Sequence, residues 1–162
     1  MDEDEIHQLA MSIIGLDKEF IGVIPKNQIP DLSMKSTAKS FIINTDKYGY
    51  PVSHWVGIYI SQNDYVIYFD SFGIDPTIDP YILNLINKCG KNHLYFSNKQ
   101  IQSFNSSLCG LYVLYILYLL TYRKFSLKEC IDLFDDVNLE NNDNMIRHVF
   151  KDIFVLLKMN MV

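Results

Sequence analysis

His54, Asp70 and Cys109 are of the residue types that together can perform nucleophilic chemistry on a carbonyl group. Cys109 stands at the head of an apolar run, and the first turn of a helix favours thiolate over thiol through its dipole and its unpaired backbone N–H groups. A free thiol titrates at about pH 8.5, so chemistry near neutral pH also needs a base or an imidazolium beside it. His54 is the candidate for that role.

Two short β-type runs predict where a partner for His54 lies. Residues 54–60 and 65–70 are separated by a polar stretch, which is typical of a hairpin. A three-residue loop at 61–63 would place His54 directly opposite Asp70. Opposed residues share a face with Cβ atoms about 4.5 to 5.5 Å apart, so the carboxylate could hold an imidazole N–H, whereas a one-residue slip would put the pair on opposite faces.

This arrangement predicts acyl transfer through a thioester. Asp70 would fix the imidazole tautomer and stabilise the imidazolium, while the other ring nitrogen takes the thiol proton and returns it to the leaving amine. The oxyanion needs donors, and the backbone N–H of Cys109 is one source. Gln102 could supply an amide as the second, although Gln100, on the same face, could compete with it.

Each of these residues also has a structural interpretation. Cys109 could be a small core residue, His54 a satisfied strand histidine, and Asp70 a turn former at a strand end. Trp55 alternates away from His54 along the strand, so we expect it in the core, with a second possible role as a wall of the site.

Composition restricts the other classes of function. The net charge is −5, which disfavours a phosphate backbone as the main partner, and the acidic start of the chain is unlike a signal peptide. Three widely spaced cysteines predict neither a disulfide framework nor a zinc site. The longest apolar run, residues 109–122, is shorter than the roughly 18 to 20 residues that a membrane span needs.

The elements that must position these residues form one predicted domain, residues 1–162. Its order predicts an α+β fold in which a sheet packs against a central buried helix that carries the nucleophile. We expect helices at 2–15, 79–88, 107–122, from a capping box at Ser126 to Glu129, and at 142–158; strands at 41–45, 54–60, 65–70, 93–96 and 100–102; and an irregular segment at 20–39.

Three motifs resemble, in order, those of the adenovirus-type maturation cysteine proteases (the adenain family), which are related to SUMO-specific proteases. The likeness covers most of residues 1–118. The motifs are His54-Trp55, Tyr68-Phe69-Asp70-Ser71-Phe72-Gly73 and Gln102-x-x-Asn105-Ser106-x-x-Cys109-Gly110, and residues 5–22 and 41–45 are also similar.

The resemblance implies a papain-related, adenain-like fold with a mixed sheet. It assigns His54 as base, Asp70 as its orienting acid, Gln102 and the Cys109 N–H as the oxyanion hole, and Cys109 as nucleophile. The family carries Glu where Asp70 stands, and Cys89 lies only near the position that bonds an activating peptide there.

The expected function is a cysteine endopeptidase that processes viral capsid or core precursors during virion maturation and cuts near small residues such as Gly. We expect a monomer in the virion and the infected cell, in cytoplasm or nucleus, acting on viral precursor polypeptides without metal, cofactor or membrane. Activation by a peptide or by DNA is not expected. The alternatives are a protease of the deubiquitinase or deSUMOylase kind that acts on Gly-Gly tails, and a catalytically inactive binding module of the same fold.

Overall fold

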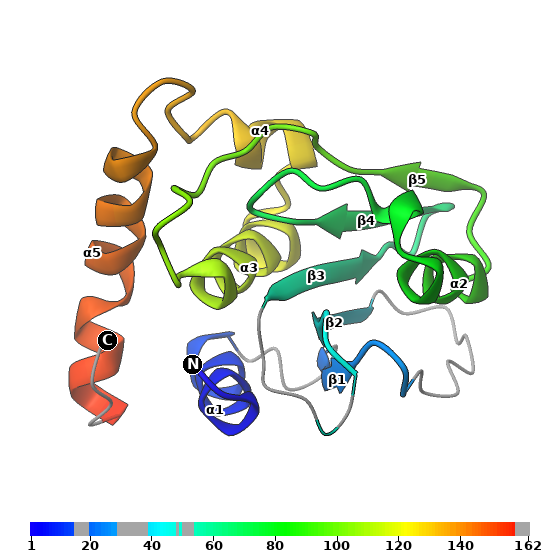
Figure 1. Cartoon of the computed structure of the whole chain (residues 1–162), viewed down its shortest axis with the longest axis horizontal. Coiled ribbons are helices and arrows are strands. Elements are labelled where there is room, and N and C mark those ends of the chain that lie inside the picture. The colour runs from blue at the N-terminus through cyan, green and yellow to red at the C-terminus, as the bar shows by residue number, and fades with distance from the viewer. Residues whose placement is uncertain (15–19, 29–38, 48, 50–53, 158–162) are drawn as a thin grey trace.

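The computed structural model describes residues 1–14, 20–28, 39–47, 49 and 54–157. Its elements are α1 (Glu3–Ile14), β1 (Phe20–Pro25), β2 (Lys39–Asn44), β3 (Trp55–Ile60), β4 (Tyr65–Phe69), α2 (Pro80–Lys88), β5 (His93–Tyr95), α3 (Cys109–Tyr118), α4 (Leu127–Ile131) and α5 (Leu139–Leu157) (Figure 1). A 3-10 turn at Pro76–Ile78 precedes α2, and a π-helical turn at Leu119–Arg123 continues α3.

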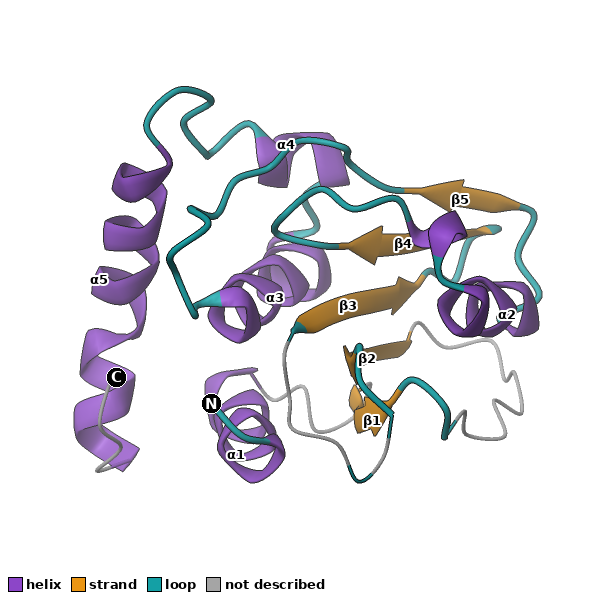
Figure 2. Ribbon diagram, viewed as in Figure 1, coloured by secondary structure: helices purple, strands orange, loops and turns teal. Residues whose placement is uncertain are grey.

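The five strands form one mixed sheet in the order β1-β2-β3-β4-β5. The central pairs, β2 with β3 and β3 with β4, are antiparallel, while β1 and β5 pair in parallel at the two edges. Helices α1 and α3 lie on one side of the sheet and α2 lies on the other (Figure 2). The predicted α+β architecture, with a sheet against a central buried helix that carries Cys109, is confirmed, although this helix begins at Cys109 rather than at 107.

Side-chain alternation along the strands divides the core into two clusters. Trp55, Tyr59 and Phe69 face the cluster built around α3, whereas Val56 and Tyr68 face the cluster that contains α2. A sheet covered on both faces explains why β3 is buried along its whole length.

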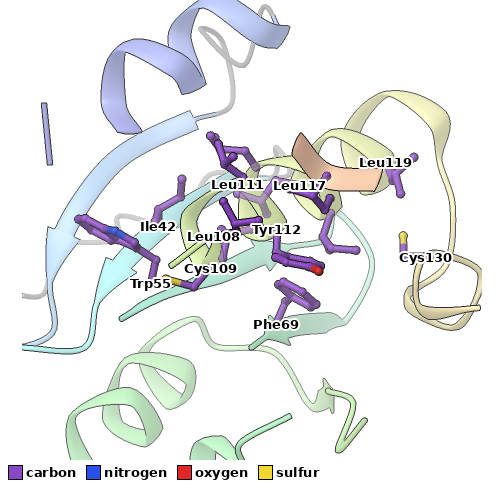
Figure 3. Packing of buried hydrophobic residues seen from close by; sticks show 14 of the residues in the cluster. Ile42, Trp55, Phe69, Leu108, Cys109, Leu111, Tyr112, Leu117, Leu119 and Cys130 are labelled. Atoms are coloured by element: carbon purple, nitrogen blue, oxygen red, sulfur yellow. The ribbon is translucent and has the colours of Figure 1, made fainter. Parts of the chain in front are cut away.

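Helix α3 is enclosed on nearly all sides. Eight of its ten residues are buried. Figure 3 shows four of them within the packed cluster: Cys109, Leu111, Tyr112 and Leu117. The helix approaches β3 closely at Gly57, where an added Cβ would stand 2.9 Å from Val113 Cγ1. An apolar sequence on nearly all sides of the helix is what this enclosure requires.

The β3–β4 register differs from the prediction. Gly57 pairs with Phe69, so His54 is not directly opposite Asp70, and the expected pairing is wrong by two residues. The loop lies one position later than predicted, because Ser61 N donates to Tyr65 O at 3.0 Å and so belongs to the ladder. A shift of two residues preserves the face of every side chain, so His54 and Asp70 become diagonal neighbours on one face.

Smaller differences have local causes. The segment expected to be irregular contains β1, an edge strand whose register shifts between Phe20 and Gly22 and so hides its period; residues 29–38 of it lie outside the described chain. Residues 100–102 form no strand. The final helix begins at Leu139 rather than at 142, and its predicted end at 158 is outside the described residues. The capping box of Ser126 and Glu129 is confirmed.

Candidate active site

The ends of three elements meet at one end of the sheet. His54 immediately precedes β3, and Asp70 immediately follows β4; because these strands are antiparallel, the two positions lie together. Cys109 is the first residue of α3, which packs along β3 (Figure 1). The structure therefore brings the three predicted residues to one place.

The Asp70 carboxylate is buried and lies against His54. Its Oδ1 is 3.0 Å from His54 Nε2 and also accepts a hydrogen bond from Phe72 N at 2.7 Å. Tyr68 Oη donates to Oδ2 at 3.4 Å. The carboxylate is therefore held in a fixed orientation before any substrate binds.

The imidazole of His54 is largely enclosed, with 13% of its side chain exposed. Burial lowers its pKa, but short-range and Coulomb interactions with Asp70 and Cys109 outweigh that effect and raise the pKa from the ordinary 6.5 to about 9. Among the described residues neither ring nitrogen makes a well-directed hydrogen bond, since the Nε2 contact is close but poorly aligned. Catalytic hydrogen bonds are often misaligned in this way without substrate.

Cys109 is 7% exposed and sits at a helix start with no side-chain cap. The backbone N–H groups of this first turn therefore remain as donors for an anion. At Gly110 an added Cβ would lie 2.8 Å from Ile6 Cδ1 and 3.2 Å from Trp55 Cδ1, so the Cys-Gly pair suits the tight packing of α1 against α3.

The other two cysteines have a different environment. Burial raises the pKa of Cys89 to about 12 and that of Cys130 to about 12. All three thiols are free. Of the three cysteines, only Cys109 interacts with an imidazole, that of His54.

Gln102 is fully buried between two serines. Ser71 Oγ donates to its Oε1 at 2.7 Å, and its Nε2 donates to Ser106 O at 2.7 Å. Within the described chain Nε2 makes this one hydrogen bond, so its second N–H is the group left for an oxyanion. Gln100, the predicted competitor, donates through its own Nε2 to Gln102 O at 2.8 Å.

Trp55 lies in the core beside the start of α3 (Figure 3). Its Nε1 donates to Met1 O at 3.4 Å. This placement fits the expected packing role and leaves little of its surface for a ligand.

Sequence reasoning did not single out the aromatic residues around the site. The centroid of the Phe72 ring lies 5.1 Å from that of the His54 ring, and the Phe104 ring stacks on Phe72 with the two centroids 6.2 Å apart. Phe104 is 82% exposed. Phe72 lies within a quoted motif and could have been found there, whereas no pattern pointed to Phe104.

One cavity beside the sheet, of about 410 Å³, is lined by His54, Asp70, Phe72 and Ile74 among others, although Cys109 and Gln102 are not among its lining residues. A larger one, of about 690 Å³, lies between Tyr95 and α4 and includes none of the three predicted residues, so we attach the chemistry to the smaller.

Within the residues that the structure describes, no group of three or more His, Cys, Asp or Glu side chains is placed to hold a metal ion. The helices of the same residues include none with the length and apolarity to cross a bilayer.

Comparison with known proteins gives one sequence match. No family model matches the chain. R355 of Acanthamoeba polyphaga mimivirus, whose name proposes a thiol protease, is 38% identical over 80 residues, which is 44% of this chain and 26% of that protein. The chain thus matches about a quarter of the length of this viral relative. The match confirms the resemblance to a viral thiol protease that the motifs predicted.

Solved structures give more distant likenesses. The central domain of the uncharacterized Lpg1148 protein from Legionella pneumophila has a TM-score of 0.54 at 20% identity, covering 85% of this chain and 86% of that domain, and so shows the same fold. The ASFV pS273R protease has a TM-score of 0.47 at 18% identity, covering 61% of this chain and 39% of that protein.

Proposed function

We propose that the chain is a cysteine protease with Cys109 as nucleophile, His54 as general base and acid, and Asp70 as the group that orients the imidazole. One observation carries the proposal: a single imidazole lies between the Asp70 carboxylate, 3.0 Å from Nε2, and the thiol at the start of α3. The viral relative named as a thiol protease supports the same chemistry.

The proposed reaction uses both ring nitrogens of His54. Because Nε2 faces Asp70, Nδ1 is left to take the thiol proton. The thiolate attacks the peptide carbonyl and forms a sulfur–carbon bond, and the oxyanion is held by the Cys109 N–H and the free amide N–H of Gln102. The carbon–nitrogen bond then breaks as the imidazolium protonates the leaving amine, and water hydrolyses the thioester.

The proposed substrates are viral precursor polypeptides cut near small residues such as Gly during virion maturation. The support for this choice is the motif resemblance together with the viral source of the sequence match. The exposed ring of Phe104, continuous through Phe72 with His54, offers an apolar surface on which an extended polypeptide could lie. Within this proposal the enzyme acts as a monomer in the virion and the infected cell, without a cofactor and without a DNA or peptide activator.

The first experiment measures chemistry at the thiol. Wild-type protein and the Cys109→Ala and Cys130→Ala variants are incubated with virion precursor proteins, and the products are identified by mass spectrometry. We expect cleavage by the wild type and by Cys130→Ala, and none by Cys109→Ala. A ubiquitin-like precursor forms a parallel arm, and its cleavage with no cut in virion precursors would assign the chain to the Gly-Gly proteases instead.

A second experiment separates the enzyme from an inactive binding module. Cys109 should be alkylated faster than free cysteine at about pH 6, where only an activated thiol holds much thiolate. A rate no higher than that of free cysteine, with no cleavage, would favour the binding module.

A further inference from the structure

The start of α5 carries two buried polar side chains that the proposed reaction does not use. Asn142 and Asp143 are each 3% exposed. A carboxylate is costly to bury unless its oxygens accept hydrogen bonds, so the partners of Asp143 indicate why it is tolerated. The part of the chain that the structure describes offers it no ion pair.

Both oxygens of Asp143 accept from hydroxyl groups near the candidate site. Tyr112 Oη, in α3 three residues after Cys109, donates to Oδ1 at 2.7 Å. Ser103 Oγ donates a hydrogen bond to Oδ2. The carboxylate therefore joins α5 to α3 and to the loop that leads to the nucleophile.

Asn142 holds the other side of the same loop. Its Nδ2 donates to Ile101 O at 2.9 Å and to Asp135 O at 2.9 Å. Ile101 and Ser103 flank Gln102, so both neighbours of the expected oxyanion donor are fixed by consecutive residues of α5.

The fixed loop also contacts the turn after Asp70. Ile101 N and Gln102 N donate to Ser71 O at 2.9 and 3.2 Å. The Gln102 carboxamide then lies between Ser71 Oγ and Ser106 O with no freedom to turn, because its Nε2 must face the Ser106 carbonyl. A shift of the loop would move this group relative to Cys109.

We propose that Asp143 is a positioning residue of the proposed active site: from the C-terminal helix it holds Ser103, and through Ser103 it fixes the Gln102 carboxamide beside the loop to Cys109. This inference rests on the proposed function, because Gln102 matters to the rate only if Cys109 attacks a carbonyl. A carboxylate suits the role since it offers acceptors alone, and both of the hydroxyls that it meets can donate.

The test compares Asp143→Ala, Asp143→Asn and Ser103→Ala with two controls on α5, the exposed Asp152→Ala and the core variant Phe154→Leu. We expect Asp143→Ala to lower kcat by about tenfold to a hundredfold with KM nearly unchanged, as for a catalytic group displaced by about 1 Å. Asn can still accept from one hydroxyl and donate to the other, so Asp143→Asn should recover most of the loss. Ser103→Ala, which leaves the Tyr112 bond intact, should show a smaller fall in kcat.

Two readouts separate positioning from simple loss of stability. Hydrogen exchange of the 101–108 backbone amides should be faster in Asp143→Ala than in Phe154→Leu. The alkylation rate of Cys109 at about pH 6 should match the wild type, since Asp143 touches neither His54 nor Asp70. If Asp143→Ala does not fold, Ser103→Ala decides between the outcomes.

The inference is overturned if wild type cleaves substrate while Asp143→Ala, or Ser103→Ala in its place, equals Asp152→Ala in kcat. It is also overturned if Asp143→Ala lowers kcat and the alkylation rate of Cys109 together, in the same way as Phe154→Leu. If the wild-type protein cleaves no substrate and its Cys109 is alkylated no faster than free cysteine, the proposed function is rejected, and the inference with it.

Discussion

Replacing Asp70 by Asn should lower the pKa of His54 and remove activity on the alkaline side. Burial lowers this pKa, but the interactions with Asp70 and Cys109 outweigh it and raise the pKa from 6.5 to about 9. The net shift corresponds to about 3 kcal/mol in favour of the imidazolium. Asn keeps the shape of the side chain and an acceptor for Phe72 N but has no charge. If Asp70 supplies half of that energy, the pKa falls by about one unit.

The assay is the pH dependence of kcat/KM. If the proposed mechanism acts through a thiolate beside an imidazolium, activity should be lost as the pH rises through the pKa of His54, near 9 in the wild type. In Asp70→Asn this alkaline limb should move down by about one unit, which by itself lowers the imidazolium fraction at pH 8 by about twofold. Loss of the carboxylate that orients the imidazole should lower kcat/KM further at every pH. Direct titration of the His54 ring by NMR should show the same displacement.

The control is Asp132→Asn, which removes an exposed carboxylate that pairs with Lys128. Its alkaline limb should remain near that of the wild type. An alkaline limb that stays near 9 in Asp70→Asn, or moves equally in Asp132→Asn, would refute the assignment of Asp70 as the partner of His54.

Three other outcomes are expected. Phe104→Ala should raise KM about tenfold and leave the unfolding midpoint unchanged, because its ring is 82% exposed; a large loss of stability or an unchanged KM contradicts a role in substrate binding. Gly57→Ala should cost about 1 to 3 kcal/mol of unfolding free energy, because its Cβ would stand 2.9 Å from Val113 Cγ1. Combining it with Val113→Ala should cost less than the sum of the two, and strict additivity would disprove the clash. Alkylation of native protein at about pH 7 should modify Cys109 alone, since burial raises the pKa of both other thiols to about 12; labelling of all three at similar rates contradicts this.

The contact of His54 with Asp70 could be predicted from the sequence even though the register could not. Loop position changes the pairing of two strands, and the polar residues 61–64 allow more than one loop. The face of the sheet on which a side chain lies depends only on whether the register shift is even or odd. Because the true register differs by two, the predicted pair still share a face, and the contact is made diagonally at 3.0 Å.

The surroundings of Gln102 could not be predicted in the same way. Its neighbours are held by Asn142 and Asp143, some forty residues later in the chain, through individual hydrogen bonds that leave no periodic trace. Helix α5 was expected from its apolar face, but that pattern says nothing of which polar residues at its start turn inward. Strand β1 could not be predicted for a local reason, because a register shift near Gly22 breaks the alternation that identifies a strand.

The distance between the imidazole and the thiol depends on a feature that neither strand nor helix determines alone. His54 immediately precedes β3 and Cys109 begins α3, so the separation of these two elements sets how closely the groups approach. A glycine lies at each of two contacts that affect this separation. Gly57, in β3, faces Val113 of α3, and Gly110, at the start of α3, faces Ile6 and Trp55. A Cβ at either position would stand less than 3 Å from a side-chain atom, so that side chain or the helix would have to shift. The Gly that follows Cys109 is therefore explained by packing, and the same packing sets where the thiol lies relative to the His54 imidazole.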